Sequence, residues 1–136
     1  MRAVIAMALL FVAACDGADP GTSSVPVEPY SCQASLPGAG ADGGVGMLAV
    51  CLDVTGGTAQ DLEKNRQQCE TEGNTFVLAP CPHEGALGGC RETTSVGVLT
   101  TWYYADGSAT ASDIQMLCEG LAGTAPPIIK IDFVAP

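Results

Sequence analysis

One order of apolar and polar positions occurs twice along the chain. The segments Val45–Leu52 and Val96–Tyr104 are rich in apolar, β-branched and aromatic residues, which predicts two β-strands. Shorter segments of the same kind follow at Thr75–Ala79 and at Ile128–Val134, and in the second of these the apolar and charged side chains alternate. Each copy of the pattern therefore predicts a longer strand and, further along the chain, a shorter one.

An amphipathic helix is predicted between the two strands of each copy. Each helix begins at a threonine, and an aspartate three residues later is able to complete a capping box. The two pairs are Thr58 with Asp61 and Thr110 with Asp113. Gly73 and Gly123 suit the turn after each helix. The offset between the copies falls from 52 to 49 residues, which predicts that the second helix is the shorter one.

The resulting order is strand, helix, strand, strand, helix, strand, in two tandem β-α-β-like repeats at residues 32–80 and 81–136. This order predicts one small α+β domain over residues 32–136. It fits a ferredoxin-like sandwich, in which two helices cover one face of a four-stranded sheet. A looser fold held by cystines, with two helices on an irregular sheet, is the alternative, because the connections are long and rich in glycine. Residues 37–46, for example, hold five glycines and are expected to form a loop.

An even number of cysteines in this domain indicates three disulfides. The six residues are Cys32, Cys51, Cys69, Cys81, Cys90 and Cys118. In a β-α-β unit the helix ends near the start of the preceding strand, which favours the pairs Cys90–Cys118 and Cys32–Cys69. Cys51 and Cys81 lie at the far ends of their strands and are expected to form the third bridge. Pairing of sequence neighbours, Cys32–Cys51 with Cys69–Cys81, is the alternative.

An apolar run from Ala3 to Ala14 follows the basic residue Arg2 and ends at Cys15. Its length matches the apolar part of a signal peptide, about 7–15 residues, and falls short of the roughly 20 residues of a membrane-spanning helix. Residues 1–14 are therefore predicted to be a signal peptide. Residues 15–31 contain three prolines and no apolar periodicity, which predicts a flexible tether.

The segment Val12-Ala13-Ala14-Cys15 resembles the lipobox of bacterial lipoproteins. The resemblance implies that Cys15 becomes the first residue of the mature chain and carries a diacylglycerol and a further acyl chain such as palmitate. Two or three acyl chains hold a protein on a membrane durably. The expected location is therefore the cell envelope, on the periplasmic face of the inner or outer membrane or at the cell surface. An ordinary secretory peptide with an incidental Cys15 is the alternative.

The negative net charge of the chain limits the classes of molecule that it is expected to bind. Without residues 1–14, four basic side chains remain against fifteen acidic ones. So acidic a chain is repelled by phosphate backbones and anionic lipid head groups, which argues against nucleic acid as a partner. No cofactor is expected. A metal site is not expected either, because His83 is the only histidine and the cysteines of an exported chain are expected to form disulfides.

A series of short motifs runs through the second half of the chain. They are Cys69 followed by Gly73-Asn74-Thr75-Phe76, then Cys81-Pro82, Gly88-Gly89-Cys90, Trp102-Tyr103-Tyr104 and Cys118. Together they resemble an uncharacterised group of cysteine-rich secreted lipoproteins of myxobacteria-like Gram-negative bacteria. This chain departs from that group at Gly89 and Trp102, where cysteines would be expected. If those two cysteines bond each other in the group, their joint absence leaves the other bridges undisturbed. The resemblance implies export and cystines but carries no activity.

No sequence motif pairs a nucleophile with a base, so enzymatic activity is not expected. The expected function is that of a small, membrane-anchored, non-enzymatic interaction or structural module of the envelope, which contacts another envelope protein or a glycan. Trp102, Tyr103 and Tyr104 are the candidate contact residues, although Trp102 and Tyr104 share one face of the predicted strand and at least one aromatic is expected in the core. The alternative is a disulfide-braced protease inhibitor that presents Cys81–Gly85, or another small binding protein.

Overall fold

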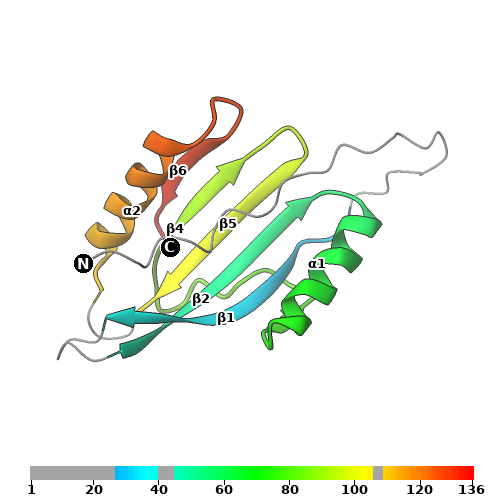
Figure 1. The fold of residues 1–136 in the computed structure, drawn as a ribbon, viewed down its shortest axis with the longest axis horizontal. Coiled ribbons are helices and arrows are strands. Elements are labelled where there is room, and N and C mark those ends of the chain that lie inside the picture. Colours follow the sequence, from blue (N-terminus) through cyan, green and yellow to red (C-terminus); the bar gives the residue numbers. More distant parts are fainter. Residues whose placement is uncertain (1–26, 40–44, 106–108) are drawn as a thin grey trace.

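The structure, a computed structural model, describes residues 27–39, 45–105 and 109–136. The predicted signal peptide, Cys15 and most of the predicted tether lie outside these residues. The described chain forms six strands in one antiparallel sheet and two helices (Figure 1). In chain order they are β1 (Tyr30–Ala39), β2 (Val45–Gly56), α1 (Ala59–Thr71), β3 (Thr75–Val77), β4 (Ala86–Thr93), β5 (Gly97–Tyr104), α2 (Ala111–Thr124) and β6 (Lys130–Val134).

The order strand, strand, helix, strand occurs twice. Within the sheet the strands follow the order β3-β1-β2-β5-β4-β6, so each repeat forms one half, and β2 pairs with β5 between them. In each half the helix links two parallel strands that flank a third: α1 links β2 to β3 around β1, and α2 links β5 to β6 around β4. The α+β class is confirmed. The sheet has six strands rather than four, because each repeat contains one strand that the sequence pattern did not predict.

Both helices lie on the same face of the sheet. Side chains that are directly opposite each other in a ladder project to one face. The register places Cys32 opposite Leu52, Leu52 opposite Thr101, and Thr101 opposite Cys90. Cys32 is bonded to Cys69 of α1 and Cys90 is bonded to Cys118 of α2, so this row faces both helices. We call the opposite side of the sheet the second face.

The two unpredicted strands occupy segments whose composition indicates turns. β1 begins at Tyr30, inside the predicted tether, and runs to Ala39, inside the predicted loop 37–46, of which residues 40–44 lie outside the described chain. β4 occupies part of the predicted glycine-rich connection. Its glycines serve close packing: a Cβ at Gly88 would stand 2.4 Å from the Phe133 ring, and one at Gly89 would stand 3.1 Å from the Trp102 ring. Glycine here marks the close approach of side chains from the neighbouring strands β6 and β5, and not a turn.

Both helices begin as predicted. At Thr58 and at Thr110 the hydroxyl accepts a hydrogen bond from the backbone of the aspartate three residues later, and the aspartate accepts one from the threonine backbone, which confirms the two capping boxes. Gly73 follows α1 with a φ of 77° and confirms the predicted turn. The prediction for Gly123 is wrong, because α2 continues to Thr124. The second helix is also not the shorter one: α1 has 13 residues and α2 has 14.

Three disulfides join the helices and the connecting segment to the sheet. The pairs are Cys32–Cys69, Cys51–Cys81 and Cys90–Cys118, which confirms the connectivity that β-α-β geometry favours over the pairing of sequence neighbours. The physical reason differs slightly from the one used in the prediction. Cys32 and Cys90 lie in β1 and β4, the strands directly beneath the helices, and not ahead of the strands that precede them.

Candidate functional site

The segment that joins the two repeats, residues 78–85, crosses the sheet. It starts after β3, at one edge, and ends at β4, which is separated from β3 by β1, β2 and β5. Cys81 lies within this segment and is bonded to Cys51 of β2. Cys51 adjoins Leu52, whose side chain faces the helices, so Cys51 projects from the second face. The second face is therefore the one that residues 78–85, which we call the crossing segment, pass over.

Asp53 fixes the middle of the crossing segment. One oxygen of its carboxylate accepts a hydrogen bond from the Cys81 amide, and the other accepts one from Trp102 Nε1 at 2.9 Å. The Cys51–Cys81 bridge lies beside these bonds, and Cys51, Cys81 and Trp102 are all at most 4% exposed. Asp53 is half-buried, and a carboxylate partly withdrawn from water needs such partners for its oxygens. The result is a rigid junction between the crossing segment, β2 and β5.

Two further contacts hold the crossing segment on either side of this junction. The Tyr104 hydroxyl donates a hydrogen bond to the Pro82 carbonyl oxygen. Burial, assisted by the negative charge of Asp53, raises the pKa of Tyr104, so its hydroxyl keeps the proton that it donates. The imidazole of His83 packs against the Trp102 indole, with ring centroids 4.2 Å apart. The predicted inhibitor loop therefore lies against the sheet and does not project from it.

A row of polar side chains runs across the second face beneath and beside the crossing segment. Its members occupy consecutive cross-strand positions on β1, β2, β5, β4 and β6. They are Ser31, Asp53, Thr100, Arg91 and Asp132. Ser31 is fully buried, and its hydroxyl has no hydrogen-bond partner among the described residues, whereas Arg91 is exposed. We call this set the polar row.

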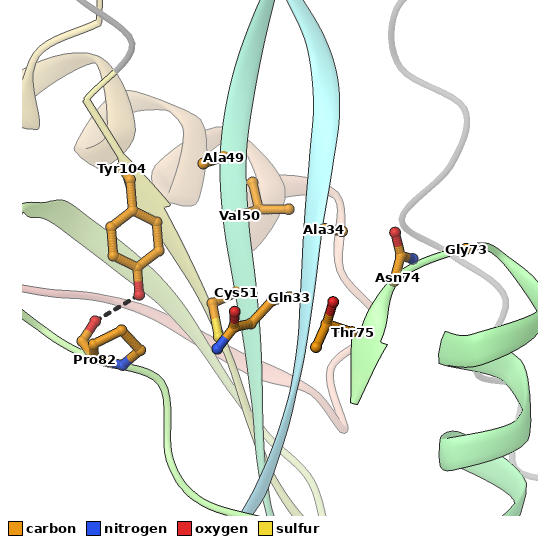
Figure 2. A pocket seen from close by; sticks show the side chains of 10 residues that line it. All are labelled: Gln33, Ala34, Ala49, Val50, Cys51, Gly73, Asn74, Thr75, Pro82 and Tyr104. Carbon is orange, nitrogen blue, oxygen red and sulfur yellow. Dashed lines mark hydrogen bonds between the residues drawn. The ribbon is translucent and has the colours of Figure 1, made fainter. Parts of the chain in front are cut away.

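The crossing segment leaves a recess on each side. The first has a volume of about 600 Å³, and its lining carries amide and hydroxyl groups but no charged side chain. Figure 2 shows Tyr104 and Pro82 at one end of this recess and Gly73 and Asn74 at the other, with Gln33 and Thr75 between them. We call it the Tyr104 recess.

The second recess has a volume of about 400 Å³ and lies over β2, β5 and β4. Trp102, Val98 and Val134 provide apolar walls. Three members of the polar row, Thr100, Arg91 and Asp53, add a hydroxyl, a cation and a carboxylate. Volumes of roughly 300–1,000 Å³ are usual for small-ligand sites. We call it the Trp102 recess.

The three predicted contact residues separate as the alternation of a strand requires. Trp102 packs with the Cys51–Cys81 bridge on the second face, and Tyr103 packs with the Cys90–Cys118 cluster on the helix face. Trp102 is 4% exposed, which confirms that one of the aromatics belongs to the core. Of the three, Tyr104 lines the larger recess.

The two positions at which the chain departs from the cysteine pattern, Gly89 and Trp102, are cross-strand partners in β4 and β5. Side chains at such positions face each other, so the absence of a Cβ at Gly89 gives the indole its place on the sheet. Gly89 and Trp102 are therefore spatially complementary in this chain, and three bridges form without cysteines at these two positions.

The described residues contain no group of three or more His, Cys, Asp or Glu side chains able to hold a metal ion. Asp53 uses both carboxylate oxygens to hold the Cys81 amide and the Trp102 indole, and Ser31 is inaccessible. Neither of the described helices is long and apolar enough to cross a membrane. The arrangement is suited to binding by preformed walls.

Sequence reasoning missed Asp53, Thr100 and Arg91 as members of one site. They lie on three strands, and only the register places them in a row. Alternation within β5 was a usable signal for Thr100, which shares a face with Trp102. For Arg91 no signal existed, because β4 itself was not predicted.

Comparison of the chain with protein-family models, with curated proteins and with solved structures finds no match in any of the three.

Proposed function

We propose that this protein is an exported, lipid-anchored binding module of the cell envelope without enzymatic activity. The observation that carries the proposal is the crossing segment, which a disulfide and the bonds to Asp53 and Tyr104 hold rigidly over the second face. Its two recesses have preformed walls. Preformed walls lower the entropy cost of binding, because less has to be ordered on association. The anchor at Cys15 and the tether up to the described domain would present this face to a partner in the envelope.

The polar, uncharged lining of the Tyr104 recess favours a glycan or a neutral protein segment as the partner. Gln33 and Thr75 are exposed there, and Asn74 is half-buried. Amide and hydroxyl groups of this kind donate and accept hydrogen bonds without demanding an opposite charge. The chain has a net charge of −10, so a recess without charged side chains differs from the acidic character of the protein as a whole.

The anchor is tested by replacing Cys15. The C15S chain is expected to accumulate as an unprocessed precursor, whereas the wild-type chain is expected to carry acyl mass at a mature N-terminus that starts at Cys15. Intact-mass spectrometry of both chains measures this. A wild-type protein without acyl mass would refute the anchor but not the binding module.

The binding module is tested by crosslinking and pull-down of the intact lipoprotein from its own envelope, with two matched variants. T75R fills the Tyr104 recess, and Q67R adds the same side chain at an exposed position of α1 on the other face. We expect one partner to be captured by wild type and by Q67R and lost with T75R. Equal capture by both variants would refute the second face as the binding surface.

A protease inhibitor is the second candidate, and the geometry favours it less. The Pro82 carbonyl oxygen accepts a hydrogen bond from Tyr104 and the His83 ring packs at a tilt against Trp102, so both would have to leave these contacts to enter a protease cleft. Incubation with a panel of proteases tests it, and a stoichiometric, uncleaved complex would establish inhibition.

A further inference from the structure

The Trp102 recess combines apolar walls with one cation, Arg91, and one carboxylate, Asp53, whose two oxygens accept hydrogen bonds from Cys81 and Trp102. Trp102, Val98 and Val134 line it from β5 and β6, and His83 and Pro80 of the crossing segment form its rim. Thr100, which is only 9% exposed, contributes the floor between them. Such a surface can bind an apolar group against its walls, with the guanidinium of Arg91 beside that group.

Arg91 differs from the other arginine in the described chain. Arg66 is paired with Glu63 and Glu70 along α1, whereas Arg91 makes no salt bridge among the residues that the structure describes. The N–H groups of an unpaired guanidinium lie in one plane and are free to donate hydrogen bonds to a ligand in the recess.

The two acidic members of the polar row nearest to Arg91 are already engaged. Asp132, its cross-strand partner on β6, is paired with Lys130 at 2.9 Å. Asp53 accepts hydrogen bonds from Cys81 and Trp102 with its two oxygens. Neither carboxylate has to be released for Arg91 to meet an external anion.

We propose that the Trp102 recess binds a small organic carboxylate with an apolar body. The guanidinium of Arg91 takes the carboxylate through two parallel N–H···O bonds, and the apolar body packs against Trp102, Val98 and Val134. A free apolar acid and the C-terminal residue of a peptide share this chemistry. The inference rests on the proposed function, since it names the class of ligand for one of the two recesses.

Trp102 is the only tryptophan of the chain, so its fluorescence reports on the recess without labelling. The purified mature protein is titrated in detergent micelles with three carboxylates of the same branched body: 4-methylpentanoate, N-acetyl-leucine and N-acetyl-Gly-Gly-Leu. N-acetyl-leucinamide is the uncharged control. We expect saturable changes with the acids and binding at least about tenfold weaker with the amide, because a hydrogen bond to a charged group contributes about 1.5–3 kcal/mol. Tighter binding of the peptide identifies a C-terminus as the source, and tighter binding of 4-methylpentanoate identifies a free acid.

Two variants that remove one positive charge each assign the effect to Arg91. R91Q is expected to bind the acids about tenfold more weakly and to lose the preference over the amide. K64Q, at an exposed position of α1, is expected to bind as wild type does. R91K keeps the charge but not the planar fork and is expected to fall between R91Q and wild type. Near-ultraviolet circular dichroism of Trp102 verifies that each variant is folded.

The absence of a saturable response to every acid would overturn the inference, as would equal binding by R91Q and K64Q. If R91Q does not fold, the ratio between acid and amide in the wild-type protein still decides the question. The proposed function fails separately, because it is tested at the Tyr104 recess by T75R and Q67R.

Discussion

The two repeats share one topology but are held together by different interactions. In the second repeat, α2 buries Ile114 and Cys118 against the sheet, and the partly buried residues around them are apolar: Leu87, Tyr103, Leu121, Ile131 and Phe133. In the first repeat, Cys69 is the only residue of α1 that is fully buried. The apolar contacts of the first repeat centre on the buried Tyr30, whose ring lies 5.5 Å from the Phe76 ring and whose hydroxyl accepts a hydrogen bond of 2.6 Å from Asn65 of α1.

The comparison shows what a disulfide contributes in each setting. The bridges of the two repeats close segments of similar sequence separation, 37 and 28 residues. Chain-entropy arguments then give both a similar effect, about 4 kcal/mol each. Any difference in stability between the two repeats must therefore come from the folded state. The Cys90–Cys118 bridge lies inside a hydrophobic cluster, whereas the Cys32–Cys69 bridge compensates for a smaller one.

The largest effects are expected from removing these bridges. In C32A/C69A and C90A/C118A, unfolding by urea should show losses of about 4 kcal/mol each, with a greater loss for the second pair, whose sulfurs lie inside the apolar cluster. Hydrogen exchange should accelerate most in α1 for C32A/C69A, because local opening of that weakly packed helix adds to the loss of global stability. Equal acceleration throughout the sheet would contradict the distinction between the repeats.

The apolar contacts of the two helices can be compared directly. I114A, at a position that is 4% exposed, is expected to cost about 3 kcal/mol, through lost burial and the cavity that remains. L62A truncates a half-buried residue of α1 and is expected to cost about 1 kcal/mol. Thermal or urea denaturation measures both. A cost at Leu62 that equals the one at Ile114 would show that α1 has a core of its own.

The hydrogen bond in the first repeat has a control in the second. Y30F removes the acceptor of Asn65 and is expected to cost about 1 kcal/mol. Y103F removes a hydroxyl that makes no hydrogen bond among the described residues, and it should leave the free energy of unfolding nearly unchanged. The comparison fails if Y103F is the more destabilising variant.

The smallest effects concern pH. Burial raises the pKa of Glu92 in β4 above its ordinary value of 4.5, so the folded state binds a proton that the unfolded state has lost. Stability from this group is therefore present at acid pH and is lost as pH rises through the folded pKa. E92Q should gain stability relative to wild type between weakly acidic and neutral pH. A constant difference across that range would contradict the assignment.

The capping boxes respond in the opposite direction, and equally in both repeats. Hydrogen bonds from Thr58 and Thr110 lower the pKa of Asp61 and Asp113 below 3.8. Their stabilisation is present above that value and is lost as pH falls through the folded pKa. D61N and D113N should therefore lose the same small acid-dependent contribution to the free energy of unfolding. A marked difference between the two would show that α1 and α2 depend unequally on their caps.

Local signals in the sequence were sufficient for the helices and for the bridges. A threonine and an aspartate three residues apart suffice to start a helix, because both members of a capping box are neighbours in sequence. The disulfide connectivity followed from the expectation that each helix ends near the start of the strand before it. The predicted turn at Gly123 was wrong, because α2 continues to Thr124 and ends at Ala125 in an extended conformation, which does not require a glycine.

The additional strands and the candidate site depended on the tertiary structure. β1 and β4 contain small residues, and β1 also contains Pro37, which local propensity assigns to loops. Their neighbours in the sheet supply the hydrogen bonds that make them strands. Gly88 and Gly89 are required because the Phe133 and Trp102 rings cover them.

Alternation along one strand determines which side chains share a face, and the sequence alone determined this for Trp102, Tyr103 and Tyr104. It does not determine which strands become neighbours. Asp53 and Arg91 join the same polar row only because Thr100 pairs with both of them across β5, and Asp53 meets the Trp102 indole from a position 49 residues earlier in the chain. The two helices cover one face of the sheet, so the crossing segment passes over the other face. The two recesses lie beside it and are therefore products of the strand order and not of any single segment.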